Sequence, residues 1–237
     1  MKQSTKRLVA SVAVVAALGA ACGDDDGNDN ASGDTTTTEQ STSSTMAADT
    51  GVDSPASELR STLTAGLQEH VYLAGIAIST AVGAGGNLED PAVASAVQTL
   101  DGNSVALSEA VGSVYGDEGG EQFLSLWRDH IGFFVDYTLG KATGDMAKAD
   151  EAKAKLDGYR TEFGAFIDSA SDGELPSDAV AADLGMHVDS LIAAIDAVVA
   201  KSPDAFPKLQ AAAAHMPMTA ATLAGGIAAQ MPDEFGV

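Results

Sequence analysis

The stretch Leu100-Asp101-Gly102-Asn103 returns 56 residues later as Leu156-Asp157-Gly158-Tyr159, and one further step of 56 residues reaches His215. Other positions keep the same step: Leu107 corresponds to Phe163 and Thr219, and Val111 corresponds to Ile167 and Leu223. Self-similarity at this period is typical of repeated two-helix units, each of which buries an apolar stripe against its neighbours.

The spacing of apolar residues identifies the elements that repeat. Alanine, leucine, valine and isoleucine recur at intervals of three and four, which favours helices over strands. Clusters of glycine, serine and proline separate these segments and indicate turns. We therefore predict an all-α fold of six helices, arranged as three repeated two-helix hairpins that form a bundle, over residues 57–82, 91–113, 119–142, 145–170, 177–200 and 204–229.

The first 22 residues resemble a bacterial lipoprotein signal peptide. A short basic region precedes an uncharged apolar run over residues 8–21, which is too short to span a bilayer as a mature helix. The run ends in Leu18-Gly19-Ala20-Ala21-Cys22, which is similar to a lipobox, although Leu18 stands four positions before the cysteine and not three. The resemblance implies that Cys22 carries a lipid and holds the protein on the extracytoplasmic face of the cell membrane. The alternative is an ordinary secretory signal with an incidental cysteine.

Composition divides the rest of the chain into two parts. Residues 23–55 are acidic and rich in serine and threonine, and they contain too few apolar side chains to form a core. We expect them to be a disordered tether, followed by a helical-repeat domain over residues 56–237. Cys22 is the only cysteine, which excludes an intramolecular disulfide.

The charge of the chain restricts its partners. Without residues 1–22 it has nine basic and 34 acidic residues, a formal charge of −25. This charge disfavours nucleic acid as a partner and also disfavours electrostatic docking on anionic lipid. We therefore expect no nucleic acid and a membrane contact made only through the lipid anchor, whereas a protein partner remains open.

All four histidines fall within the repeat. His70, His130 and His187 occupy one repeat position, and His215 lies at the matching place in the last helix. Apolar residues at helical spacing flank the first three, so their rings are expected inside the fold. Neutral imidazoles that converge inside a bundle are typical of a transition-metal site, and His215 with Met218 three residues later suits copper before zinc or iron. Glu69 and Asp129 precede two of the histidines and are candidates for the second coordination shell.

Other interpretations of the histidines stay open. One structural histidine, hydrogen-bonded to a carbonyl of the next helix, would be copied with its hairpin by duplication, and repetition alone is therefore not proof of ligation. A haem or another ligand is a further possibility. The main alternative function is a non-catalytic helical-repeat module that binds a protein partner or an apolar ligand in a groove between hairpins. The sequence contains no recognisable catalytic motif, and we predict no enzyme activity.

Three stretches resemble a poorly characterised family of exported helical-repeat proteins of Gram-positive bacteria: residues 67–71, residues 114–116 with 123–137, and residues 186–189, with the sequences LQEHV, VYG with FLSLWRDHIGFFVDY, and MHVD. Some members of that family carry a domain similar to the N-terminal domain of copper amine oxidases. The resemblance implies a helical fold and an extracytoplasmic location. It transfers no catalytic residue, because that N-terminal domain does not hold the copper of the oxidase and is absent from this chain.

Overall fold

The computed structural model describes residues 51–237, which form helices and no strands. The helices are α1 (Pro55–Gly83), α2 (Pro91–Thr143), α3 (Met146–Ala170), α4 (Ser177–Val199), α5 (Ala205–Gln230) and the short α6 (Pro232–Phe235). The all-α prediction is confirmed for this part of the chain. The predicted signal peptide, Cys22 and most of the predicted tether lie outside the described residues.

Local sequence signals set the starts of the long helices. Pro55 and Pro91 occupy the first turns of α1 and α2, where a missing backbone N–H costs nothing. The residue before each proline caps the helix: the Ser54 side chain accepts a hydrogen bond from the Ser57 amide, and Asp90 accepts one from Ala92 at 2.8 Å. Asp145 caps α3 in the same way.

The predicted break between two helices at residues 116–120 is found at Gly116, but it is shorter than predicted. The label α2 covers two helical segments that meet at a kink, where Gly116 has a non-helical φ of 81° and ψ of 169°, and residues 117–120 already belong to the second segment. Gly120 is helical, and a Cβ added there would lie 2.8 Å from the carbonyl oxygen of Ser108. Its lack of a side chain therefore permits the close approach of the two halves of α2, residues 91–115 and 117–143. The prediction also missed α6.

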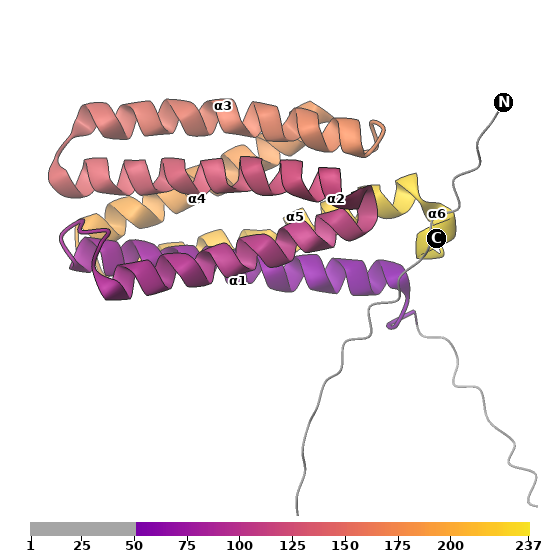
Figure 1. The fold of residues 1–237 in the computed structure, drawn as a ribbon, viewed down its shortest axis with the longest axis horizontal. Helices are drawn as coiled ribbons and strands as arrows, with labels where there is room; N and C mark the ends of the chain where they lie inside the picture. Colours follow the sequence, from indigo (N-terminus) through magenta and orange to yellow (C-terminus); the bar gives the residue numbers. More distant parts are fainter. Residues whose placement is uncertain (1–50) are drawn as a thin grey trace, which may run out of the picture. The chain divides into compact units, whose positions relative to one another are not determined.

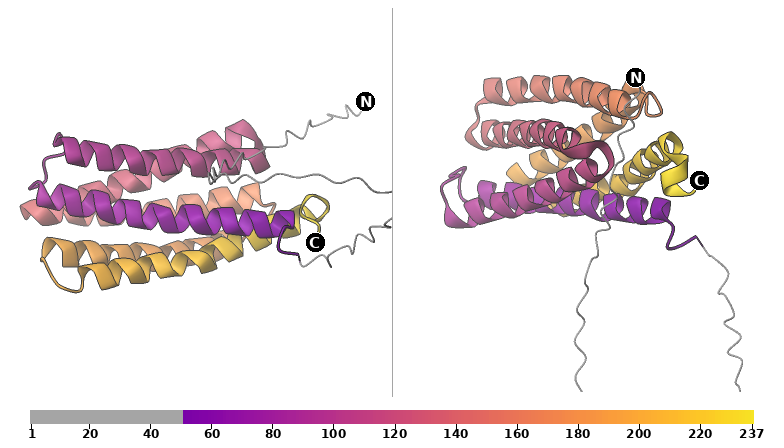
Figure 2. Two further views of the ribbon diagram at one scale, coloured as in Figure 1. Left: turned by 90° about the horizontal axis from the view of Figure 1, so that it is seen from below. Right: turned by 45° about the vertical axis from the view of Figure 1, so that its right-hand side comes forward.

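The long helices pack in a ring. Helix α1 contacts α5 and α2, α3 contacts α2 and α4, and α4 contacts α5, which closes the ring. Helix α4 also touches α1 and α2. Figure 1 shows α3 beside the second half of α2, with the first half of α2 beside α1, and Figure 2 shows the same bundle from two other directions. No helix within residues 51–237 is long and apolar enough to cross a membrane.

The core consists of two apolar clusters that follow each other along the bundle. The first contains Leu67, Trp127 and Phe163, with Met216 from α5. The second contains small and aliphatic side chains with two aromatic rings: Ala74, Ala77, Ile78, Leu100, Phe134, Tyr137, Leu156, Val188, Leu191, Ile192 and Ile195. Helices α1, α2, α3 and α4 contribute to both clusters, so each of them crosses the boundary between the two.

Two glycines of α3 test how closely the helices must approach. A Cβ on Gly164 would lie 2.6 Å from the backbone carbonyl oxygen of Ser177, at the start of α4, whereas a Cβ on Gly158 would meet nothing within 4 Å. We expect Gly164→Ala to lower the free energy of unfolding by about 1–3 kcal/mol through overpacking. Gly158→Ala should raise it by up to about 1 kcal/mol, since alanine favours a helix. Urea denaturation measures both, and equal effects of the two substitutions would contradict the close α3–α4 contact.

Candidate functional site

Three histidines lie at the boundary between the two apolar clusters. His70 on α1, His130 on α2 and His187 on α4 have exposed fractions of 2%, 3% and 7%. Near each histidine a residue of the first cluster precedes it and residues of the second follow it: Leu67 and Ala74 flank His70, Trp127 and Phe134 flank His130, and Val180 and Val188 flank His187. The prediction that these three rings lie inside the fold is confirmed.

His70 and His130 lie side by side, and two aromatic residues surround them. The centroids of the two imidazole rings are 5.4 Å apart. The indole of Trp127 contacts both, with centroid distances of 4.8 Å to His70 and 4.6 Å to His130. The phenol ring of Tyr159 on α3 stacks on His130 at 4.9 Å.

Within residues 51–237, six buried side-chain polar atoms have no hydrogen-bond partner in the protein. They are Nδ1 of His70, His130 and His187, Nε1 of Trp127, the hydroxyl of Tyr159 and Oδ1 of Asn103. We call these six residues the histidine layer. An unpaired buried polar group costs about 1–3 kcal/mol. Six such groups together would cost an amount close to the whole unfolding free energy of a typical domain. Their polar atoms are therefore expected to bind a partner that the protein does not supply.

The repeat period relates two residues of the layer, Asn103 and Tyr159, to His215. Asn103, Tyr159 and His215 are the three positions that lie 56 residues apart in the sequence. Asn103 lies beside His70, Tyr159 stacks on His130, and His215 is an ionisable neighbour of His187. His70, His130 and His187 therefore each face one residue of the series Asn103, Tyr159 and His215. Sequence reasoning used the period to find the histidines but did not nominate Asn103, Tyr159 or Trp127 as site residues.

The surroundings keep the three buried imidazoles neutral. Burial, with a smaller contribution from the nearby His187, lowers the pKa of His70 to about 3, and the interaction with the Asn103 side chain opposes this with a still smaller effect. Burial also lowers the pKa of His130 well below its usual value, and the neighbouring His70 and His187 add to the effect, against smaller opposing interactions with the backbone of Trp127 and Leu126. For His187 burial and His215 lower the pKa to about 4, against a smaller opposing effect of Asp183. Neutral imidazoles have a free lone pair, as metal ligation requires.

His215 differs from the other three histidines because it has a partner. Its Nε2 lies 2.9 Å from Oδ1 of Asp183 on α4, and the Thr219 hydroxyl donates to the other carboxylate oxygen at 2.7 Å. His215 and Asp183 are partly exposed. The pair therefore lies at the edge of the bundle core, next to His187, and not within the His70–His130 contact.

The methionines are placed differently from the prediction. Met218 is 61% exposed, so its thioether faces solvent, whereas Met216 is 4% exposed and packs in the first apolar cluster. Met216 lines a cavity of about 70 Å³ together with His70, Trp127, His187 and Asp183. We call this space the inner cavity. The buried thioether near the histidines is therefore that of Met216.

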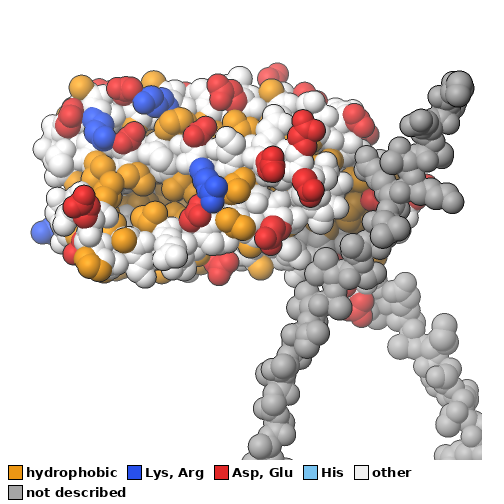
Figure 3. All heavy atoms as spheres, in the orientation of Figure 1, with side chains coloured by type: hydrophobic (Ala, Val, Ile, Leu, Met, Phe, Trp, Pro, Cys, Tyr) orange, Lys and Arg blue, Asp and Glu red, His pale blue; other side chains and the backbone are white. Residues whose placement is uncertain are grey.

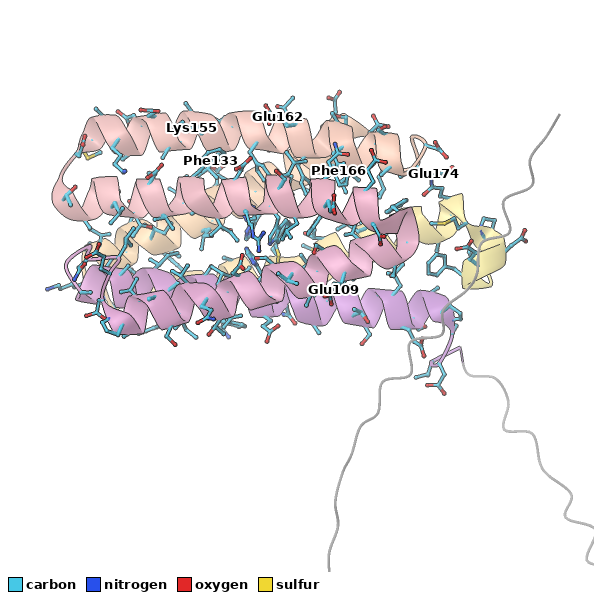
Figure 4. The ribbon with its side chains drawn as sticks, viewed as in Figure 1. Glu109, Phe133, Lys155, Glu162, Phe166 and Glu174 are labelled. Carbon is cyan, nitrogen blue, oxygen red and sulfur yellow. The ribbon has the colours of Figure 1, made fainter. Side chains whose placement is uncertain are left out.

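The predicted second-shell carboxylates are both exposed. Glu69 nevertheless reaches the layer indirectly, because the Asn103 side-chain amide donates to Glu69 at 2.9 Å and lies beside His70. No such link is found for Asp129. Glu109, on the first half of α2, is exposed (Figure 4). Apart from it, the Lys155 ammonium of α3 lies over the ring of Phe133, 5.9 Å from the ring centroid.

Within residues 51–237, no group of three or more histidine, cysteine, aspartate or glutamate side chains is arranged to hold a metal ion as the structure stands. The closest approach among the predicted ligands is the His70–His130 pair. With metal–nitrogen distances of about 2.0–2.1 Å, two imidazoles on one tetrahedral ion have ring centroids about 5 Å apart. The observed separation of 5.4 Å is compatible with a shared ion, and His187 would have to move closer to become a third ligand.

Comparison with known proteins found no family model, no curated protein and no solved structure that matches this chain. The resemblance to exported helical-repeat proteins therefore stays a prediction. The fold and the site together describe a helical bundle with a layer of neutral histidines in its core.

The lowered pKa values predict a stability that falls in mild acid. Because His70 and His187 have folded pKa values of about 3 and about 4, against 6.5 when unfolded, the unfolded chain binds more protons below pH 6.5. Each of these histidines should therefore cost about 2 kcal/mol of unfolding free energy between pH 7 and pH 5. Denaturation at the two pH values measures the loss. His70→Leu and His187→Leu should each reduce the pH dependence, and an unchanged dependence in both variants would contradict the assignment.

Proposed function

We propose that the helical domain binds one transition-metal ion in the histidine layer, copper first and zinc or iron second. His70 and His130 supply two nitrogen ligands, and His187 supplies the third after a small shift of α4. The observation that carries the proposal is the set of unpaired Nδ1 atoms on three neutral, neighbouring imidazoles. Imidazole nitrogen suits copper, zinc and iron, and the Met216 thioether of the inner cavity favours copper among them.

The unpaired nitrogens also weigh against a purely structural role for these histidines. A structural histidine ladder gives each ring a partner of its own, such as a carbonyl of the next helix. Here that description fits His215, which pairs with Asp183. The Nδ1 atoms of His70, His130 and His187 make no hydrogen bond of good geometry, although His70 interacts with Asn103, and His130 with the backbone of Leu126 and Trp127 in its own helix. We assign His215 to the surroundings of the site, where Asp183 fixes its orientation beside His187, in the manner of carboxylate–histidine pairs around metal centres.

Trp127 gives a direct measurement of metal binding. It is the only tryptophan of the chain and contacts both His70 and His130. Titration of the metal-free protein with Cu²⁺ should quench its fluorescence and saturate at one equivalent. Zn²⁺ should compete for the same site without comparable quenching.

Matched variants decide between ligation and structure. His70→Gln and His130→Gln should weaken copper binding by more than the about 10–100-fold that follows loss of an outer-shell partner. His215→Gln should have a smaller effect, and Met218→Leu, at an exposed position, should have none. Absence of saturable binding, or equal affinity in all four variants, would leave the histidines with a structural role only.

We further propose that the bundle is built from three hairpins of common origin. They are α1 with the first half of α2, the second half of α2 with α3, and α4 with α5. The facing pairs His70 with Asn103, His130 with Tyr159 and His187 with His215 support this division, since each pair joins the first and second helix of one hairpin.

The location is proposed from the sequence alone. Cys22, at the end of the lipobox-like segment, carries the lipid that holds the domain at the extracytoplasmic face of the cell membrane. Two acyl chains on a diacylglyceryl cysteine suffice for stable anchoring, whereas one chain gives only marginal binding.

Substitution of the cysteine tests this proposal. Cys22→Ala should abolish incorporation of a labelled fatty acid and shift the protein from the detergent phase to the aqueous phase on Triton X-114 partitioning. Cys22→Ser is the matched control for side-chain size and should behave in the same way. Wild-type labelling in either variant would show that the lipid is attached at another residue and would contradict the proposal.

A further inference from the structure

A second cavity reaches the same pair of histidines from the surface. It has a volume of about 50 Å³ and lies between α1 and the two halves of α2, and we call it the outer cavity. Val97 and Leu88 at its rim are exposed, and Leu100 and Phe134 are buried in its wall. Figure 3 shows hydrophobic side chains gathered around a hollow between the two halves of α2.

The lining of the outer cavity selects uncharged molecules. Its polar side chains are His70, His130 and Thr138, and the Thr138 hydroxyl donates to the Phe134 carbonyl oxygen at 2.8 Å. A polar ligand atom could therefore interact only with the two imidazoles or with the Thr138 oxygen, whose proton is already donated to Phe134. No ionised side chain lines the cavity, so an ion that entered would lose its hydration without compensation.

The volume restricts the occupant to a few atoms. A cavity needs about 10–15 Å³ to hold one water molecule, and an engineered apolar cavity of about 150 Å³ binds benzene or xenon. A space of about 50 Å³ lies between these limits, so it fits a diatomic molecule or a single xenon atom but not a ring. Apolar walls also make it unfavourable for water, which needs two to four polar partners.

We propose that the outer cavity binds a small uncharged apolar molecule, of the size of dioxygen, which enters between the two halves of α2 and rests against His70 and His130. This inference rests on the proposed function and deepens it, because the molecule would reach His70 and His130, two of the proposed ligands of the ion. It does not require a metal, however, since the walls alone provide the binding. The two proposals can therefore fail separately.

Xenon and iodide form a matched pair of probes, since they are isoelectronic and similar in size but differ in charge. The full chain, treated with a chelator to remove metal, is labelled at its methyl groups and studied by NMR under increasing xenon pressure. We expect saturable shifts at Leu100, Ile131 and Leu139, which line the outer cavity, and no saturable shift there with iodide. Equal effects of both probes, or xenon shifts without saturation, would overturn the proposal.

Two substitutions locate the entrance. Val97→Phe enlarges a side chain at the rim and should weaken xenon binding at least tenfold, whereas Ile76→Phe makes a similar change at an exposed position outside the cavity and should leave it unchanged. Both positions are exposed, so neither variant should unfold the domain. Copper titration of the same two variants separates the proposals: loss of xenon binding with intact copper binding supports the cavity, and equal xenon affinity in both variants contradicts it.

Discussion

The structure depends on keeping three imidazoles uncharged between two apolar clusters. A proton on His70 would place a positive charge beside His130 and Trp127, with no carboxylate in contact and the nearest acid, Glu69, reached only through Asn103. Charges that are buried without a partner cost far more than unpaired neutral groups. Packing of the apolar clusters and neutrality of the layer therefore depend on each other. The exclusion of water that stabilises the clusters also disfavours protonation of the imidazoles.

The same requirement explains why His215 and Asp183 lie where they do. A carboxylate within the layer would favour protonation of its neighbours and oppose their lowered pKa values. Asp183 already has this opposing effect on His187, although burial outweighs it. Its position at the partly exposed edge of the core, with both oxygens bound by His215 and Thr219, limits the effect to one histidine of the three.

The sequence predicted the helices well because apolar spacing and capping residues act locally. It predicted the break near Gly116 correctly but made it too long, since a glycine that breaks a helix and one that permits close packing look the same in a sequence. Gly116 does the first and Gly120 does the second. Met218 was selected because it shares a helical face with His215. His215 itself lies at the edge of the core, so its face leads to solvent, and Met216 on a different face of α5 is buried. Neither distinction can be made without the positions of the neighbouring helices.

The three facing pairs share a histidine but differ in the residue that faces it. In the three proposed hairpins, the inner position, on the first helix, holds His70, His130 or His187, whereas the outer position, on the second helix, holds asparagine, tyrosine and histidine in turn. If the inner ring served only to hydrogen-bond its partner, a change of partner from an amide to a phenol to an imidazole would be matched by different inner residues or by different geometry. Instead the inner Nδ1 atoms remain unpaired beside each of the three. The three inner positions share a buried, neutral imidazole with a lone pair on nitrogen, and coordination of a metal ion requires that property.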